Sequence, residues 1–157
     1  MSAEENKAIA LRTSEIVNQK NADLIEEFYP PDLVWHAPDQ DIRGYEEARQ
    51  FVSTFFDAFP DINITVEDVI GEGDQVVSRY TIRGTHQGET EEYGPPTGRQ
   101  MELEGITIHR FEDGKIAEEW ERSPATDWVP ESAPDDRLDL THDNLGALQQ
   151  LGLAPEQ

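Results

Sequence analysis

The sequence predicts an α+β domain, and three observations support this prediction. Apolar residues recur at helical spacing in the first 60 residues, the period changes to two after Pro60, and turn signals divide the following strands into hairpins. The chain of 157 residues has the length of one ordinary domain. Helices followed by antiparallel strands are typical of a fold in which helices pack on one face of a sheet.

Three helices are expected before Pro60. The first covers residues 3–19, which contain neither Gly nor Pro and carry apolar residues at helical spacing. The second is short, has Asn21 as its N-cap and ends before Pro30. The third stops at Pro60, and its apolar face consists of Ala48, Val52, Phe55, Phe56 and Phe59.

Strands are expected on both sides of the third helix. Residues 33–36 form a brief strand that is followed by an acidic loop at 39–41. After Pro60, residues 62–70 and 75–86 form a first hairpin, with Ile64 and Ile70 on the same face of its first strand. Residues 100–112 and 115–122 form a second hairpin across Asp113-Gly114, a strong two-residue turn signal.

The remainder of the chain belongs to the same domain, which spans residues 1–157. An acidic, Pro-rich insertion is expected at about residues 123–142, and a final helix at about 143–152, with Gly152 at its C-terminal stop position.

The strong negative charge limits the classes of partner. Twelve basic residues stand against 34 acidic ones, for a formal charge of -22, which disfavours nucleic-acid binding. No apolar run is long enough for a membrane span or signal peptide, so a cytoplasmic location is expected. The acidic surface is similar to that of proteins from halophilic archaea, because molar salt screens like charges; solubilisation or a basic partner are the alternatives.

A series of short segments, in the same order along the chain, forms a pattern shared with a known family. These segments are Ala58-Phe59-Pro60-Asp61, Val66-Glu67-Asp68, Gly71-Glu72-Gly73-Asp74, Gly84-Thr85-His86-Gln87-Gly88-Glu89, Pro95-Pro96-Thr97-Gly98, Asp113-Gly114-Lys115-Ile116-Ala117-Glu118-Glu119-Trp120 and Leu148-Gln149-Gln150-Leu151-Gly152. Together they resemble the SnoaL-like polyketide cyclase (ester cyclase) family. This resemblance implies the cone-shaped nuclear transport factor 2-like (cystatin-like) fold, in which a curved antiparallel sheet wraps around N-terminal helices and leaves a deep pocket, usually in a homodimer.

The resemblance also implies a reaction, the aldol-type cyclisation of a polyketide ester without a cofactor. In such cyclases an Asp is the general acid/base and histidines help to hold the oxygen that carries enolate charge. This chemistry needs a carboxylate of raised pKa in apolar surroundings. The residues expected to line the pocket are Trp35, Phe55, Phe59, Tyr80, His109 and Trp120.

The expected catalytic residues are Asp127, His86 and His36. His86 follows the alternation of the strand that ends the first hairpin, and His36 ends the strand at 33–36. The family's Asp follows the last-strand Trp by a few residues, and alignment forward from Trp120 selects Asp127. Alignment backward from the last helix selects Asp143, and Glu121 is the nearest acid.

The sequence leaves three functions open. The first is a cyclase or isomerase that acts on a neutral, apolar carbonyl compound without a metal or cofactor, since the histidines lack the spacing of a metal site. The second is a non-catalytic module that binds a hydrophobic small molecule. The third is a structural dimer.

Overall fold

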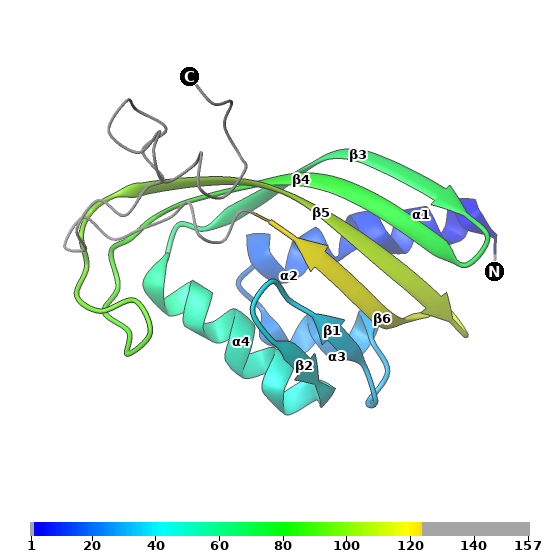
Figure 1. Cartoon of the computed structure of the whole chain (residues 1–157), viewed down its shortest axis with the longest axis horizontal. Coiled ribbons are helices and arrows are strands. Elements are labelled where there is room, and N and C mark those ends of the chain that lie inside the picture. The colour runs from blue at the N-terminus through cyan, green and yellow to red at the C-terminus, as the bar shows by residue number, and fades with distance from the viewer. Residues whose placement is uncertain (1, 124–157) are drawn as a thin grey trace, which may run out of the picture.

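The protein folds as a curved sheet with its helices on one side, as the computed structural model in Figure 1 shows. The structure describes residues 2–123. The predicted α+β fold, with a curved sheet wrapped around N-terminal helices, is confirmed. The expected insertion, the final helix, Asp127 and Asp143 lie outside the described residues.

The helices follow the predicted order, with one break. Residues 3–19 form two helices instead of one, because the hydrogen bonding tightens at Thr13, whose N–H is shared between the carbonyls of Ile9 and Ala10 and whose hydroxyl donates to Ala10 at 2.7 Å. Asn21 caps the following turn through its side chain, as predicted. The helices are α1 (Ala3–Arg12), α2 (Ser14–Asn18), a 3₁₀ turn (Ala22–Leu24), α3 (Ile25–Phe28) and α4 (Gly44–Ala58).

Six strands form the sheet in the order β2-β1-β6-β5-β4-β3. Both predicted hairpins are present, and Asp113 and Gly114 have the positive φ values that a tight two-residue turn requires. Among the described strands, β1 and β6 are the one parallel pair. The strands are β1 (Val34–His36), β2 (Asp41–Arg43), β3 (Asn63–Glu72), β4 (Gln75–Thr85), β5 (Gln100–Glu112) and β6 (Lys115–Arg122).

The expected acidic loop at 39–41 is shorter than predicted, because Asp41 begins β2. Ile42 supplies the physical reason. Its side chain is buried in the core, and its backbone position pairs with Trp35 of β1. One apolar residue between two charged ones is too short a pattern to indicate a strand.

Irregular pairing at two places changes which side chains face the helices. In β3 the register shifts between Val66 and Asp68, so Ile70 is 67% exposed instead of sharing the inner face with Ile64. Between β5 and β6 the register shifts after Phe111, which pairs with Ile116, and the next pair is Arg110 with Glu118. Ala117 is the extra residue of this β-bulge, and the alternation of β6 reverses beyond it.

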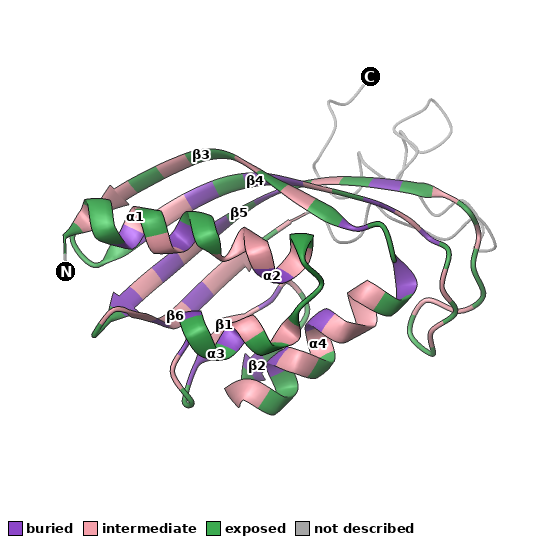
Figure 2. Cartoon of the chain, turned by 180° about the vertical axis from the view of Figure 1, so that it is seen from behind, coloured by how far each residue is buried: buried purple, intermediate pink, exposed green. Residues whose placement is uncertain are grey.

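The core lies between the helices and the concave face of the sheet. Figure 2 shows buried residues along β4, β5 and β6 and on the helices that lie in front of them in this view. One cluster joins Phe28, Leu33 and Ile42 to Val76 and Ile116 of the sheet. A second cluster, Ala58, Phe59, Ile62 and Met101, closes the end of α4 against β5. In the described part of the chain, no helix is long and apolar enough to cross a membrane.

His36 connects the edge of the sheet to its centre. Its Nδ1 lies 2.8 Å from Oδ1 of Asp41 in β2, and its Nε2 lies 2.7 Å from Oε2 of Glu118 in β6. Hydrogen bonds to Glu118 and then to Asp41 raise the pKa of His36, while the bond to His36 lowers the pKa of Glu118. Protonated His36 therefore stabilises the attachment of the β1–β2 hairpin to β6.

Replacement of His36 by Gln is expected to remove a pH-dependent part of the stability. A raised His pKa stabilises the folded protein fully below the ordinary value of 6.5 and loses this effect as pH rises through the folded-state value. Urea unfolding of wild type and His36→Gln should thus differ most at about pH 5 to 6 and converge towards pH 9. A difference that stays constant across this range would contradict the ionic attachment.

Candidate active site

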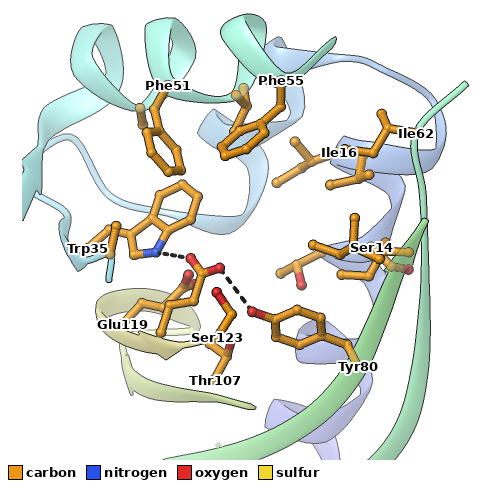
Figure 3. Close-up of a pocket in the computed structure, with 18 of the residues that line it drawn as sticks. Ser14, Ile16, Trp35, Phe51, Phe55, Ile62, Tyr80, Thr107, Glu119 and Ser123 are labelled. Atoms are coloured by element: carbon orange, nitrogen blue, oxygen red, sulfur yellow. Dashed lines mark hydrogen bonds between the residues drawn. The ribbon is translucent and has the colours of Figure 1, made fainter. Parts of the chain in front are cut away.

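A cavity of about 480 Å³ lies between α4, the N-terminal helices and the concave face of the sheet. This volume falls in the range of small-molecule sites and exceeds the roughly 300 Å³ at its lower end. Aromatic side chains form much of its wall, with Phe51 and Phe55 from α4, Trp35 from β1 and Tyr80 from β4 in view in Figure 3. The cavity can therefore hold an apolar molecule of moderate size.

A stripe of polar side chains crosses this apolar wall along three neighbouring strands. We call it the polar stripe, and it consists of Ser78 of β4, Thr107 and His109 of β5, and Glu119 and Glu121 of β6. Cross-strand pairing aligns these residues, because Ser78 pairs with Thr107, Thr107 with Glu121, and His109 with Glu119. All five therefore project from the same face of the sheet.

Glu121 lies on β6, opposite Thr107 in the polar stripe. Trp35 Nε1 and the Tyr80 hydroxyl each donate to its carboxylate at 2.9 Å, and these are the two dashed lines in Figure 3. Withdrawal from bulk water, reinforced by the charge of Glu119, raises the pKa of Glu121 to about 7 against the opposing effect of these hydrogen bonds. Both protonation states of this carboxyl group are consequently populated near neutral pH.

Glu119 is the more deeply buried of the two acids and has a different set of partners. The Tyr29 hydroxyl donates to Oε1 of Glu119 at 2.6 Å, and Nε2 of His109 lies 2.7 Å from the same oxygen. Burial, followed by the charge of Glu119, raises the pKa of Tyr29 well above its ordinary value. Tyr29 and His109 thus fix Glu119 in place, and the carboxylate fixes the ring of His109.

The position of the Tyr80 ring depends on the absence of a side chain at Gly105. The two residues pair across β4 and β5, and a Cβ atom at position 105 would collide with the Tyr80 hydroxyl and ring. The ring can therefore lie over the backbone of β5 and direct its hydroxyl to Glu121.

The structure places the predicted pocket residues on two sides of the sheet. Trp35, Phe55, Phe59, Tyr80 and His109 line the cavity. Trp120 does not, because the bulge at Ala117 turns Glu119 and Glu121 inward and the residue between them outward. Its ring stacks on His36, with the centroids 5.6 Å apart.

His36 and His86 are not among the described residues that line the cavity. His36 forms the outer attachment of β1 to β6. The side chain of His86 is fully buried behind two cavity residues, with ring centroids 5.6 Å from Phe59 and 6.4 Å from Tyr93. Its Nδ1 lies 3.1 Å from Oγ1 of Thr97, which fastens the connection between β4 and β5.

Sequence reasoning named Glu121 only as an alternative acid, and it missed Glu119, Ser78 and Thr107. The available signal was the hairpin around Asp113-Gly114, which brings His109 opposite the acidic residues of β6. The bulge shifts the partner of His109 to Glu119. A bulge of this kind has no clear mark in the sequence.

The charge of the cavity wall is one-sided. Asp39 and Glu92 join Glu119 and Glu121 in the wall, and among the described residues no Lys or Arg lines the cavity. Burial, followed by the charges of Glu92 and Asp39, raises the pKa of Tyr93 to about 12. The wall thus disfavours an anionic ligand. Within the described ranges, no group of three or more acidic or His side chains could hold a metal ion.

Solved structures with the same architecture come from several bacteria. A proposed SnoaL-like polyketide cyclase from Jannaschia sp. CCS1 is 25% identical, with a TM-score of 0.74 over 84% of this chain and 95% of its own. IdmH, a proposed polyketide cyclase from Streptomyces antibioticus, is 29% identical, with a TM-score of 0.66 over 77% and 93%. AclR, a proposed hydroxylase from Streptomyces galilaeus, is 26% identical, with a TM-score of 0.69 over 99% and 89%.

A comparison with curated proteins gave no match. The family described as SnoaL-like polyketide cyclase matches residues 7–123, which include every strand of the sheet and the whole polar stripe. The chain therefore belongs to the SnoaL-like polyketide cyclase family.

Proposed function

We propose that the protein is an enzyme that moves a proton on a neutral, largely apolar carbonyl compound, with Glu121 as the general acid/base. One observation carries this proposal. A carboxyl group with a pKa raised to about 7 lies in the wall of an apolar cavity, where Trp35 and Tyr80 hold it in place. A catalytic acid/base works best when its pKa lies near the working pH.

The character of the wall supports this class of substrate. The aromatic side chains favour an apolar ligand, and the acidic side chains, with no Lys or Arg lining the described part of the cavity, disfavour an anion. Family membership supports a cyclisation, and AclR shows that one similar structure carries the name of a hydroxylase. Fold alone does not decide between reactions, so the proposal rests on the carboxyl group.

The proposed reaction begins with proton transfer to Glu121. The ionised carboxylate takes a proton from the carbon next to a carbonyl group, and the electron pair of that C–H bond forms an enolate. In a cyclisation, this carbon attacks a second carbonyl carbon of the same molecule and forms a C–C bond. Protonated Glu121 then returns its proton to the new alkoxide, so the reaction needs no outside oxidant or reductant.

Other residues expected from the sequence have a different standing in this proposal. We do not expect His36 or His86 to contact the ligand, because neither is among the described residues that line the cavity. Asp127 and Asp143 stay predictions, and the test below includes Asp127. The homodimer, the cytoplasmic location and the high-salt setting also stay predictions from the sequence.

Glu121→Gln should abolish proton transfer while the cavity remains intact. A suitable assay follows deuterium exchange next to the carbonyl of 2-tetralone in D₂O by NMR, which requires enolisation but no ring closure. Loss of an acid/base is expected to lower the catalysed rate by about 10²–10⁴-fold. Glu104→Gln is the matched control, since Glu104 is an exposed acid of β5 that does not line the cavity, and it should leave the rate unchanged.

Two outcomes would contradict this assignment. Normal exchange in Glu121→Gln, with loss of exchange in Asp127→Asn, would move the role to Asp127. Binding of 2-tetralone by wild type without any exchange above the buffer rate would favour the non-catalytic binding module.

Glu119→Gln should shift the pH dependence of the same exchange reaction. The ionised form of Glu121 is the base, so the rate should rise with pH through the pKa of Glu121, near 7 in wild type. Because the negative charge of Glu119 helps to raise this pKa, its removal should move the rise to lower pH. An unchanged or more alkaline profile would show that Glu119 does not set the protonation of Glu121.

A further inference from the structure

We propose that Ser78 and His109 form a subsite that binds a hydroxyl group of the ligand. The subsite shares the cavity of the proposed function, and it adds a recognition element to the proton transfer at Glu121. The subsite depends on the hydrogen bonding of two buried side chains and does not require a reaction.

Both residues present a buried polar atom that lacks a partner. Ser78 and His109 are each 4% exposed, and both line the cavity. Within the described residues, Oγ of Ser78 and Nδ1 of His109 have no hydrogen-bond partner. Buried polar groups in folded proteins are nearly always hydrogen-bonded, so two such atoms on one cavity wall indicate that a bound molecule supplies the partner.

The two atoms belong to neighbouring positions of the sheet. Ser78 pairs with Thr107, and His109 follows two residues later on the same face of β5. Diagonal neighbours of this kind lie about 7–8 Å apart, which is within reach of an aromatic side chain such as that of His109. The subsite therefore lies within the polar stripe.

Glu119 determines which nitrogen of His109 is available. Its carboxylate oxygen lies 2.7 Å from Nε2 and accepts a hydrogen bond, so Nε2 carries a hydrogen. Nδ1 is then an acceptor in the neutral ring and a donor in the charged ring. The hydroxyl of Ser78 rotates and serves as either donor or acceptor.

A hydroxyl group is the ligand group that fits this pair. It donates to Nδ1 of neutral His109 while it accepts from Ser78, and it accepts from Nδ1 if the ring is charged. A carbonyl or ether oxygen only accepts, so it leaves Nδ1 of the neutral ring without a partner. The geometry thus favours an alcohol or a phenol over the corresponding ether or hydrocarbon.

A neighbouring serine shows the contrast and provides a control. Ser14 also lines the cavity, but its hydroxyl already donates to the carbonyl of Leu11 at 2.8 Å. The hydroxyl of Ser14 therefore has a hydrogen-bond partner without a ligand, and its replacement by Ala should not affect the recognition of a hydroxyl group.

Calorimetric binding of 2-naphthol, naphthalene and 2-methoxynaphthalene tests the subsite. Wild type should bind 2-naphthol on the order of 10-fold more tightly than either analogue, although naphthalene is the more hydrophobic. Ser78→Ala and His109→Gln should each remove this preference. Gln can retain the bond to Glu119 while it lacks the Nδ1 position. Ser14→Ala should keep the wild-type preference.

The other results separate this inference from the proposed function. Equal affinities of wild type for the three probes, failure of all three to bind, or a preference that survives in both variants would overturn the subsite. If His109→Gln does not fold, as judged by its urea transition, Ser78→Ala alone decides the question. If Glu121→Gln still prefers 2-naphthol and also exchanges deuterium at the wild-type rate, the proposed proton transfer at Glu121 is wrong and the subsite is still supported.

Discussion

The β-bulge at Ala117 is the constraint on which the site depends. Before the bulge, Ile116 faces the core opposite Phe111, and regular alternation would direct Glu118 and Trp120 inward. The extra residue reverses this order, so Glu119 and Glu121 enter the cavity wall while Glu118 and Trp120 meet His36 on the other side. A bulge beside a site re-aims side chains in this way.

Two acids brought into an apolar wall must be held by hydrogen bonds, and four separate elements supply these. Tyr29 follows α3, Trp35 belongs to β1, Tyr80 to β4 and His109 to β5. The partners differ in one respect that matters for chemistry. Glu119 is fixed beside an imidazole, whereas the donors to Glu121 in the described part of the chain are the neutral Trp35 and Tyr80, and the charge of Glu119 repels it. Two carboxyl groups on one strand thereby acquire different roles.

Local signals predicted most of the fold, since period-two patterns and the turns at Gly71-Glu72-Gly73-Asp74 and Asp113-Gly114 determine the hairpins. The site was less predictable because it depends on pairings between distant segments. Trp35 reaches Glu121 through the parallel pairing of β1 with β6, which no sequence period encodes. The alternation that favoured His86 holds at the end of β4, since Gly84 and His86 both meet Phe59, but the His86 ring lies behind Phe59 and not in the described cavity wall.

The central claim is that a carboxyl group of near-neutral pKa faces the cavity. Its most direct test is an NMR titration of protein labelled with ¹³C at the Glu carboxyl carbons, with the Glu121 resonance assigned by its absence from a Glu121→Gln sample. The account predicts a midpoint near pH 7 for this resonance. A midpoint near 4.5, the ordinary value for a glutamate, would contradict it.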